Sequence, residues 1–230
     1  MSKPTADPSV VVTGDGSRTL YSPQFDQTYH STFGALTESE HVFIDCAKLK
    51  QRLNEQQRVR ILEIGFGTGL NFLLSVREAS NSNSFIEYVA LENCVIPENI
   101  LRELKYEHIE GCDHNWMSLL HFLSCTNRDT LKGTHFWLRI INSLENIVSS
   151  ASANFDLIYL DAFSPNANPE LWTRDFLTAL YASLSINGVL TTYCAKGSVR
   201  RTLEAAGFEV KRMKGPPGKR EILRAKKRQD

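Results

Sequence analysis

The chain has 230 residues, of which 42% are hydrophobic and 23% are charged, and its formal net charge is zero. This length and composition suit one globular domain, with or without an added segment, and no apolar run is long enough to cross a membrane. The first twelve residues hold no apolar stretch backed by positive charge, which argues against a secretory signal. The five cysteines are scattered without a CxxC pair, so we expect reduced thiols, no metal site and a cytoplasmic location.

The amino-terminal part of the chain is expected to lie over a site rather than to contain it. Residues 1–20 are polar, with Gly and Ser among them, and are predicted to be disordered. Residues 21–57 are predicted to form a loop with aromatic residues, up to about residue 36, and then a helix. The helix is expected because apolar side chains recur at helical spacing. These side chains are Val42, Cys46, Leu49 and Leu53.

From residue 58 onward, short apolar strands alternate with helices. The predicted strands lie at 59–64, 85–91, 135–141, 155–160, 189–193, 208–213 and 221–225, and the helices at 70–79, 172–184 and 198–206. Strands separated by helices form a parallel sheet with helices on both faces. The last two strands are joined by the turn 215–218, which is too short for a helical crossover, so they must be antiparallel. Residues 97–133 are predicted to be a helical insertion.

These elements predict an α/β fold whose centre is a doubly wound, mostly parallel sheet with an antiparallel C-terminal hairpin. This Rossmann-like arrangement is the one found in class I methyltransferases that use S-adenosyl-L-methionine (SAM). We expect the domain to occupy residues 58–230, with the segment 21–57 covering its site.

The strand at 59–64 runs directly into a glycine turn that opens a helix. Its three glycines permit positive φ and let a ligand approach the backbone closely. Their spacing is G-x-G-x-G, whereas a dinucleotide fingerprint needs G-x-G-x-x-G, and no phosphate-binding lysine follows. Glu63, just before the turn, suits the ammonium group of SAM and would repel a pyrophosphate, so we predict SAM rather than NAD. The predicted cofactor residues of the turn are Gly65, Gly67, Thr68 and Gly69.

Two further side chains are candidate cofactor ligands. Glu92 ends the second strand, roughly 20 residues after the turn, where a carboxylate can accept hydrogen bonds from ribose hydroxyls. Asn142 follows the third strand, and its amide oxygen could accept a hydrogen bond from the adenine amino group. Each has a simpler alternative, because an acid can end a strand in solvent and an asparagine can cap a turn.

The fourth strand ends at Asp161. Ligands of open α/β sheets bind beyond the carboxyl ends of the strands, so Asp161 should face the same crevice as the glycine turn. In methyl transfer the protein mainly aligns the nucleophile, and an amine nucleophile must lose a proton that a carboxylate can accept. Asp161 is therefore the candidate catalytic residue, and Phe163 could stack on a planar base. The alternative is that Asp161 only accepts hydrogen bonds from nearby backbone.

Charge is unevenly distributed along the chain. From residue 211 to the end, nine Lys or Arg accompany two acidic residues. Such an excess suits an anionic partner such as RNA, and it equally suits a solvated chain end.

With these residues in place, the chain resembles the methyltransferase domain of MnmC-type tRNA modification enzymes over most of its length. Enzymes of that family methylate the 5-aminomethyl group of the wobble uridine, which is often 2-thiolated. The matching motifs are Phe25-Asp26-x-x-Tyr29-x-Ser31, Gly65-Phe66-Gly67-Thr68-Gly69-Leu70-Asn71-Phe72, Asp161-Ala162-Phe163-Ser164-Pro165-x-x-Asn168-Pro169-x-x-Trp172, Val199-Arg200-Arg201 with Ala206-Gly207-Phe208, and Lys214-Gly215 with Lys219-Arg220-Glu221.

The resemblance implies a role for each part of the site. Asp161 takes the position of the family's catalytic aspartate, and the glycine turn with Glu92 holds SAM. The loop that carries Tyr29 and Ser31 would close over the site. Asn142 stands where the family has an acid.

The resemblance also implies the partners. We expect tRNA to be the substrate, with Lys219 and Arg220 in contact with it, and no obligate protein partner and no membrane. Bifunctional members carry a flavin-dependent domain after the methyltransferase domain, whereas this sequence ends soon after its last strand. We therefore expect methylation of an already unmasked aminomethyl uridine, without flavin and without metal.

Three other functions are compatible with the fold. An aminopropyl transferase of the polyamine synthase type would need several acids for its polycationic substrate, and only Asp156 lies near Asp161 in the sequence. A non-catalytic RNA-binding protein should have lost the cofactor turn, which is intact. A NAD-dependent dehydrogenase is disfavoured by the glycine spacing and by Glu63.

Overall fold

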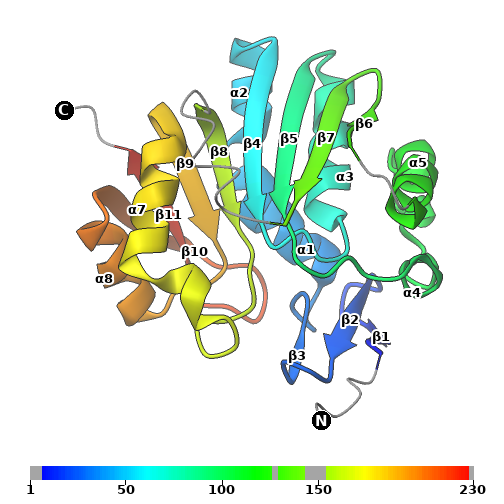
Figure 1. The fold of residues 1–230 in the computed structure, drawn as a ribbon, viewed down its shortest axis with the longest axis horizontal. Helices are drawn as coiled ribbons and strands as arrows, with labels where there is room; N and C mark the ends of the chain where they lie inside the picture. The colour runs from blue at the N-terminus through cyan, green and yellow to red at the C-terminus, as the bar shows by residue number, and fades with distance from the viewer. Residues whose placement is uncertain (1–6, 126–128, 143–153, 228–230) are drawn as a thin grey trace.

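The computed structural model describes residues 7–125, 129–142 and 154–227. At its centre is an eight-stranded sheet in the order β10-β11-β9-β8-β4-β5-β7-β6 (Figure 1). The strands are β4 (Arg58–Ile64), β5 (Phe85–Leu91), β6 (Leu131–Lys132), β7 (Phe136–Ile141), β8 (Phe155–Leu160), β9 (Leu184–Thr192), β10 (Phe208–Lys214) and β11 (Glu221–Lys227). Strands β4, β5, β7, β8 and β9 are parallel, and β10 pairs antiparallel with β11, which confirms the predicted sheet and its closing hairpin.

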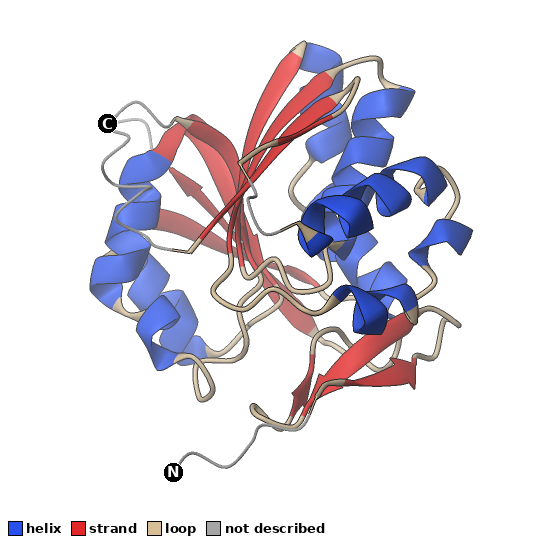
Figure 2. Ribbon diagram, turned by 45° about the vertical axis from the view of Figure 1, so that its right-hand side comes forward, coloured by secondary structure: helices blue, strands red, loops and turns tan. Residues whose placement is uncertain are grey.

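Helices cover both faces of this sheet (Figure 2). On one face lie α2 (Leu49–Glu55), α3 (Leu70–Asn81) and α5 (Asp113–Ser124), and on the other lie α7 (Arg174–Ser183) and α8 (Gly197–Ala205). Side chains alternate between the two layers along each strand. In β8, Leu157 and Tyr159 pack into the first apolar core, whereas Ile158 and Leu160 pack into the second. Burial on both faces explains the continuous apolar runs of these strands.

The amino-terminal segment is described from Asp7 onward and contains strands, which corrects the expectation of disorder for that part of residues 1–20. A three-stranded antiparallel sheet forms there from β1 (Ser9–Val12), β2 (Arg18–Ser22) and β3 (Gln27–Thr28). The polar residues between β1 and β2 build a turn around Asp15, whose carboxylate accepts hydrogen bonds from Ser17 N and Thr13 Oγ1. Polarity in this stretch therefore reflects turn chemistry. Residues 1–6 lie outside the described residues.

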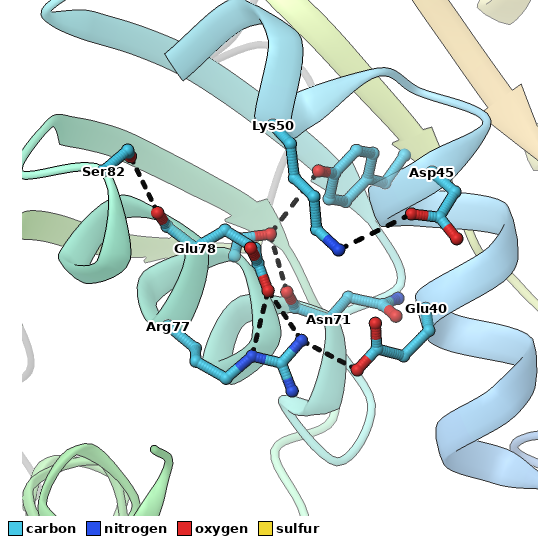
Figure 3. Close-up of polar contacts among 9 residues, drawn as sticks. Glu40, Asp45, Lys50, Asn71, Arg77, Glu78 and Ser82 are labelled. Atoms are coloured by element: carbon cyan, nitrogen blue, oxygen red, sulfur yellow. Dashed lines mark hydrogen bonds and ion pairs between the residues drawn. The ribbon is translucent and has the colours of Figure 1, made fainter. Parts of the chain in front are cut away.

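The helix predicted from the apolar spacing at 42–53 is divided between the π-helical η1 (Glu40–Asp45) and α2, which the left-handed Lys48 (φ 61°) separates. A short helix, α1 (Ala35–Ser39), precedes η1. Ion pairs stabilise the arrangement (Figure 3). Arg77 of α3 binds Glu40 of η1 and its own neighbour Glu78, both at 2.7 Å.

The described part of residues 97–133 is mainly helical, as predicted. They contain α4 (Glu98–Arg102), the short η2 (Tyr106–His108), α5 and the two-residue strand β6. A second correction concerns the helix predicted at 172–184. Thr173 ends η3 (Pro169–Trp172) and caps α7, because its Oγ1 accepts a hydrogen bond from Phe176 N, and β9 already begins at Leu184. Among the described residues, no helix is both long and apolar enough to span a membrane.

Candidate active site

A cavity of about 830 Å³ opens at the carboxyl ends of β4, β5 and β8. Its wall combines the glycine turn, the residues after β5 and β8, the turn between β10 and β11, and the amino-terminal sheet. Figure 1 shows the amino-terminal sheet beside these strand ends. This is the place where ligands bind in open α/β sheets, and the amino-terminal segment forms one side of it.

All three glycines of the turn have positive φ, at 88° for Gly65, 51° for Gly67 and 80° for Gly69. Gly65 and Gly67 line the cavity. A Cβ on Gly65 would lie 2.9 Å from Asp161 O and would collide with the backbone after β8. Thr68 does not line the cavity, because its side chain is buried and its Oγ1 lies 3.0 Å from the Tyr106 hydroxyl. Gly69 begins α3 behind the turn.

The two predicted ligands on β5 and β7 have different positions. Glu92 lines the cavity, and its carboxylate accepts hydrogen bonds from Gly67 N at 3.1 Å and from Cys94 N at 2.9 Å. Glu92 is therefore positioned beside the turn, as predicted. Asn142 follows β7 with an exposed side chain and is not part of the cavity wall.

The buried carboxyl group of Glu63 and the half-buried carboxyl group of Asp161 share one amide donor. Asn71 Nδ2 donates to Glu63 Oε1 and to Asp161 Oδ2, both at 2.8 Å. Glu63 is fully buried, and its Oε2 accepts from the Tyr88 hydroxyl at 2.9 Å. Glu63 therefore does not reach the cavity, whereas Asp161 lines it. The expectation of a direct contact between Glu63 and a cofactor ammonium is not supported by this position.

Burial raises the pKa of both carboxyl groups well above their ordinary values. For Asp161, the charge of Glu38 adds to the increase, while the Asn71 hydrogen bond and the charge of Lys219 oppose it. For Glu63, the charge of Asp161 adds to the increase, and hydrogen bonds from Asn71 and Tyr88 oppose it. A carboxylate with a raised pKa is a stronger base than one in solvent, so Asp161 is suited to accept a proton.

Lys219 is engaged within the protein. Its ammonium group pairs with the carboxylate of Glu38, whose side chain is only 7% exposed, and lies 4.1 Å from the centroid of the Tyr193 ring. Lys219 also lines the cavity, and its predicted contact with tRNA stays a prediction. Arg220 is exposed and lies outside the cavity wall.

Three aromatic rings form a cluster in the cavity. The Phe163 centroid lies 4.5 Å from that of Phe25 and 4.9 Å from that of Tyr29. Tyr29 also covers the glycine turn, since a Cβ on Gly67 would lie 3.0 Å from its ring. Burial and the charge of Glu92 raise the Tyr29 pKa to about 12, so its hydroxyl stays neutral. Ser31 lines the cavity, and its backbone N–H donates to Glu38 at 2.6 Å.

The structure thus brings together most of the predicted site residues and adds others. Asp161, Glu92, the first part of the glycine turn, Tyr29, Ser31 and Phe163 share one cavity. Sequence reasoning missed the roles of Asn71, Glu38 and Tyr193. Asn71 lies two residues after the last glycine of the turn, and this position could have indicated its role. No feature of the sequence pointed to Glu38.

Comparison with known proteins gives a consistent result. Residues 112–228 match a family model described as S-adenosyl-L-methionine-dependent methyltransferase. The bifunctional protein MnmC of Cupriavidus metallidurans, named for tRNA 5-methylaminomethyl-2-thiouridine biosynthesis, is 31% identical over 94% of this chain. The chain spans about a third of that relative, with 33% covered. These matches confirm the resemblance drawn from the motifs.

Solved structures agree on the fold. MnmC2 from Aquifex aeolicus superposes with a TM-score of 0.80 at 26% identity, covering 97% of this chain and 72% of that one. A probable spermidine synthase from Corynebacterium glutamicum has a TM-score of 0.52 at 14% identity over 98% of this chain and 80% of its own, a likeness of fold alone.

Proposed function

Since the chain belongs to the S-adenosyl-L-methionine-dependent methyltransferase family, we propose that it methylates the 5-aminomethyl nitrogen of a wobble uridine, with or without 2-thiolation, in tRNA. The observation that carries this proposal is the position of the Asp161 carboxylate, in the same cavity as the glycine turn. The names of the MnmC relatives and of MnmC2 support the choice of substrate.

The residues around the turn fit SAM. Gly65 and Gly67 leave the backbone accessible, and the cavity is large enough for a nucleoside with an amino-acid tail. Glu92, held by two backbone N–H groups, would accept hydrogen bonds from the ribose hydroxyls. Bound SAM supplies an electrophilic methyl group. The chain's own part is to hold the target amine in line with that group.

Asp161 would perform the proton chemistry. Its carboxylate can orient the incoming amine and accept the proton that the nitrogen must lose. Asn71 fixes one carboxylate oxygen at 2.8 Å, which leaves the other free to face the cavity. Glu38 and Lys219, paired with each other, also line the cavity. Phe163 and its two aromatic neighbours would receive the planar uracil ring.

Labelled methyl transfer tests this function. Purified protein would be incubated with radiolabelled SAM and tRNA that lacks only the final wobble methyl group, followed by nuclease digestion and chromatography. We expect the label in the 5-methylaminomethyl nucleoside and none when the tRNA is already fully modified. Absence of transfer by protein that binds SAM would reject the substrate.

Arg220 is expected to contribute a phosphate contact. Arg220→Glu should weaken tRNA binding and reduce the slope of log affinity against log salt by about 1, because one fewer counterion is released. Filter binding over a range of salt concentrations measures this slope. Lys50→Glu, on α2 at the opposite end of the sheet, makes the same charge change and should leave the slope unaltered. Equal slopes for Arg220→Glu and the unchanged protein would remove Arg220 from the interface.

Glu63 is expected to influence stability more than cofactor affinity. Its raised pKa means that the folded protein binds more protons than the unfolded chain between the ordinary and raised values, so its contribution to stability falls as pH rises. Glu63→Gln can accept from Asn71 through its carbonyl oxygen and donate to the Tyr88 oxygen through its amide, without a buried charge. Thermal unfolding should therefore show a gain in stability that grows as pH rises above about 4.5, with SAM affinity little changed by calorimetry. A large loss of SAM affinity would instead show that the Glu63 charge serves the cofactor.

A further inference from the structure

An exposed aromatic ring stands at the rim of the proposed cavity. Phe33 is 62% exposed although it belongs to the cavity wall, next to Thr32 and Ser31. The Phe163 ring contacts those of Phe25 and Tyr29 within the cavity, whereas Phe33 faces solvent over most of its surface. Such exposure of a large apolar side chain beside a ligand cavity often marks an interaction site.

The backbone that carries Phe33 is held firmly. Thr32 O accepts a hydrogen bond from Gly14 N at 2.9 Å, and Phe33 N donates to Ser31 Oγ at 3.2 Å. On the other side, Asp15 accepts from Thr37 N at 2.9 Å and from Thr37 Oγ1 at 2.7 Å. The β1–β2 turn therefore fixes this segment, so the ring is presented without a large loss of backbone entropy on binding.

One side of the ring rests on the turn between β10 and β11. A Cβ on Gly218 would collide with the Phe33 ring, and Gly218 also has a positive φ of 82°. The ring thus packs against glycine backbone, and the same turn carries Lys219 into the cavity. The cavity rim at Phe33 therefore joins the amino-terminal sheet to the β10–β11 hairpin.

Exposed positive charge lies on the same hairpin as Gly218. Lys214 and Arg220 are exposed at the two ends of the turn, and neither has an ion pair within the described residues. In contrast, Lys211 and Arg212 pair with Glu209 and Glu221. An aromatic ring beside exposed cations is the combination that binds single-stranded nucleic acid, through base stacking and phosphate contacts.

We propose that Phe33 is a stacking platform for the base of a nucleotide adjacent to the target uridine. This inference rests on the proposed function, because it takes the occupant of the cavity to be a nucleotide of single-stranded RNA. The target base would enter the cavity while its neighbour remains at the rim on Phe33. A protein partner is disfavoured because Phe33 is a single exposed ring on a hairpin with exposed cations rather than part of a broad apolar patch.

Substitution of the ring and removal of the base test the proposal together. The substrate is an anticodon stem-loop RNA with 5-aminomethyl uridine at the wobble position, either intact or with an abasic nucleotide on one side or the other. Phe33→Ala should lower kcat/KM for the intact RNA about tenfold, the scale of one base–aromatic stack, while Phe33→Tyr retains it. Ile186→Ala is the matched control, since Ile186 is 66% exposed at the amino end of β9, away from the cavity.

The losses of kcat/KM caused by Phe33→Ala and by the abasic nucleotide should not add. One of the two abasic RNAs should reduce kcat/KM of the unchanged protein about tenfold and that of Phe33→Ala no further. SAM binding by calorimetry, unchanged in all variants, would establish that they are folded. The proposal would be overturned if Phe33→Ala were as active as the unchanged protein. It would also be overturned if the losses of kcat/KM from Phe33→Ala and from the abasic nucleotide multiplied for both abasic RNAs. If the unchanged protein binds SAM but methylates no RNA, the proposed function fails first, and this inference fails with it.

Discussion

Replacement of Asp161 by asparagine should lower the rate of methyl transfer by about 10²–10⁴-fold, the range typical of a lost general base. An asparagine has the same shape and can still accept the hydrogen bond from Asn71, but it cannot take a proton from the substrate amine. Single-turnover methyl transfer measures the chemical step, and calorimetry should show SAM affinity little changed.

Asp156 offers a matched control on the same strand. It lies five positions earlier in β8, accepts a hydrogen bond from Arg60 N at 2.8 Å and does not line the cavity. Asp156→Asn should therefore keep its methyl-transfer rate. Full activity of Asp161→Asn would remove Asp161 from the proton chemistry, whatever the chain methylates.

The second large effect is expected at Gly65. Gly65→Ala should weaken SAM binding at least tenfold, because the new Cβ would meet the Asp161 carbonyl oxygen at 2.9 Å and the Ala162 backbone at 3.0 Å. Either the turn or the end of β8 must shift, and both belong to the cavity. The same substitution should therefore reduce affinity and rate together, measured by calorimetry and by methyl transfer.

Gly16→Ala is the control that separates the steric collision at Gly65 from backbone strain. Gly16 also has a positive φ, 81°, but nothing lies within 4 Å of the position of its Cβ. Gly16→Ala should lose about 1–2 kcal/mol of unfolding free energy from left-handed strain alone and keep its SAM affinity. Equal SAM affinity in the two variants would show that the close contact between the turn and β8 is unimportant for binding.

The parallel core of the fold could be predicted because its signals are local. Each core strand is a short apolar run, and each connection is a helix with its own spacing, so the parallel direction of the core strands follows from the sequence. The site residues at strand ends could be predicted for the same reason. Glu92 and Asp161 follow β5 and β8, and parallel strands bring their carboxyl ends to one edge of the sheet.

Other features depend on contacts that local patterns do not encode. The β1–β2 hairpin has a polar turn, and its stability comes from Asp15 bonds that reach Thr37. The pairing of Glu38 with Lys219 joins segments from opposite ends of the chain, so the basic character of the hairpin did not reveal which cation is engaged. Likewise, Asn71 acquires its role only when α3 places it between Glu63 and Asp161.

A crystal structure with SAM would show where the methyl donor lies relative to Asp161. We predict the ribose against Glu92, the amino-acid tail along the backbone of Gly65 and Gly67, and the sulfonium methyl facing the space in front of Asp161. Clear density for the cofactor elsewhere, with the turn vacant, would contradict this prediction. So would a bound cofactor whose methyl group is walled off from the Asp161 carboxylate.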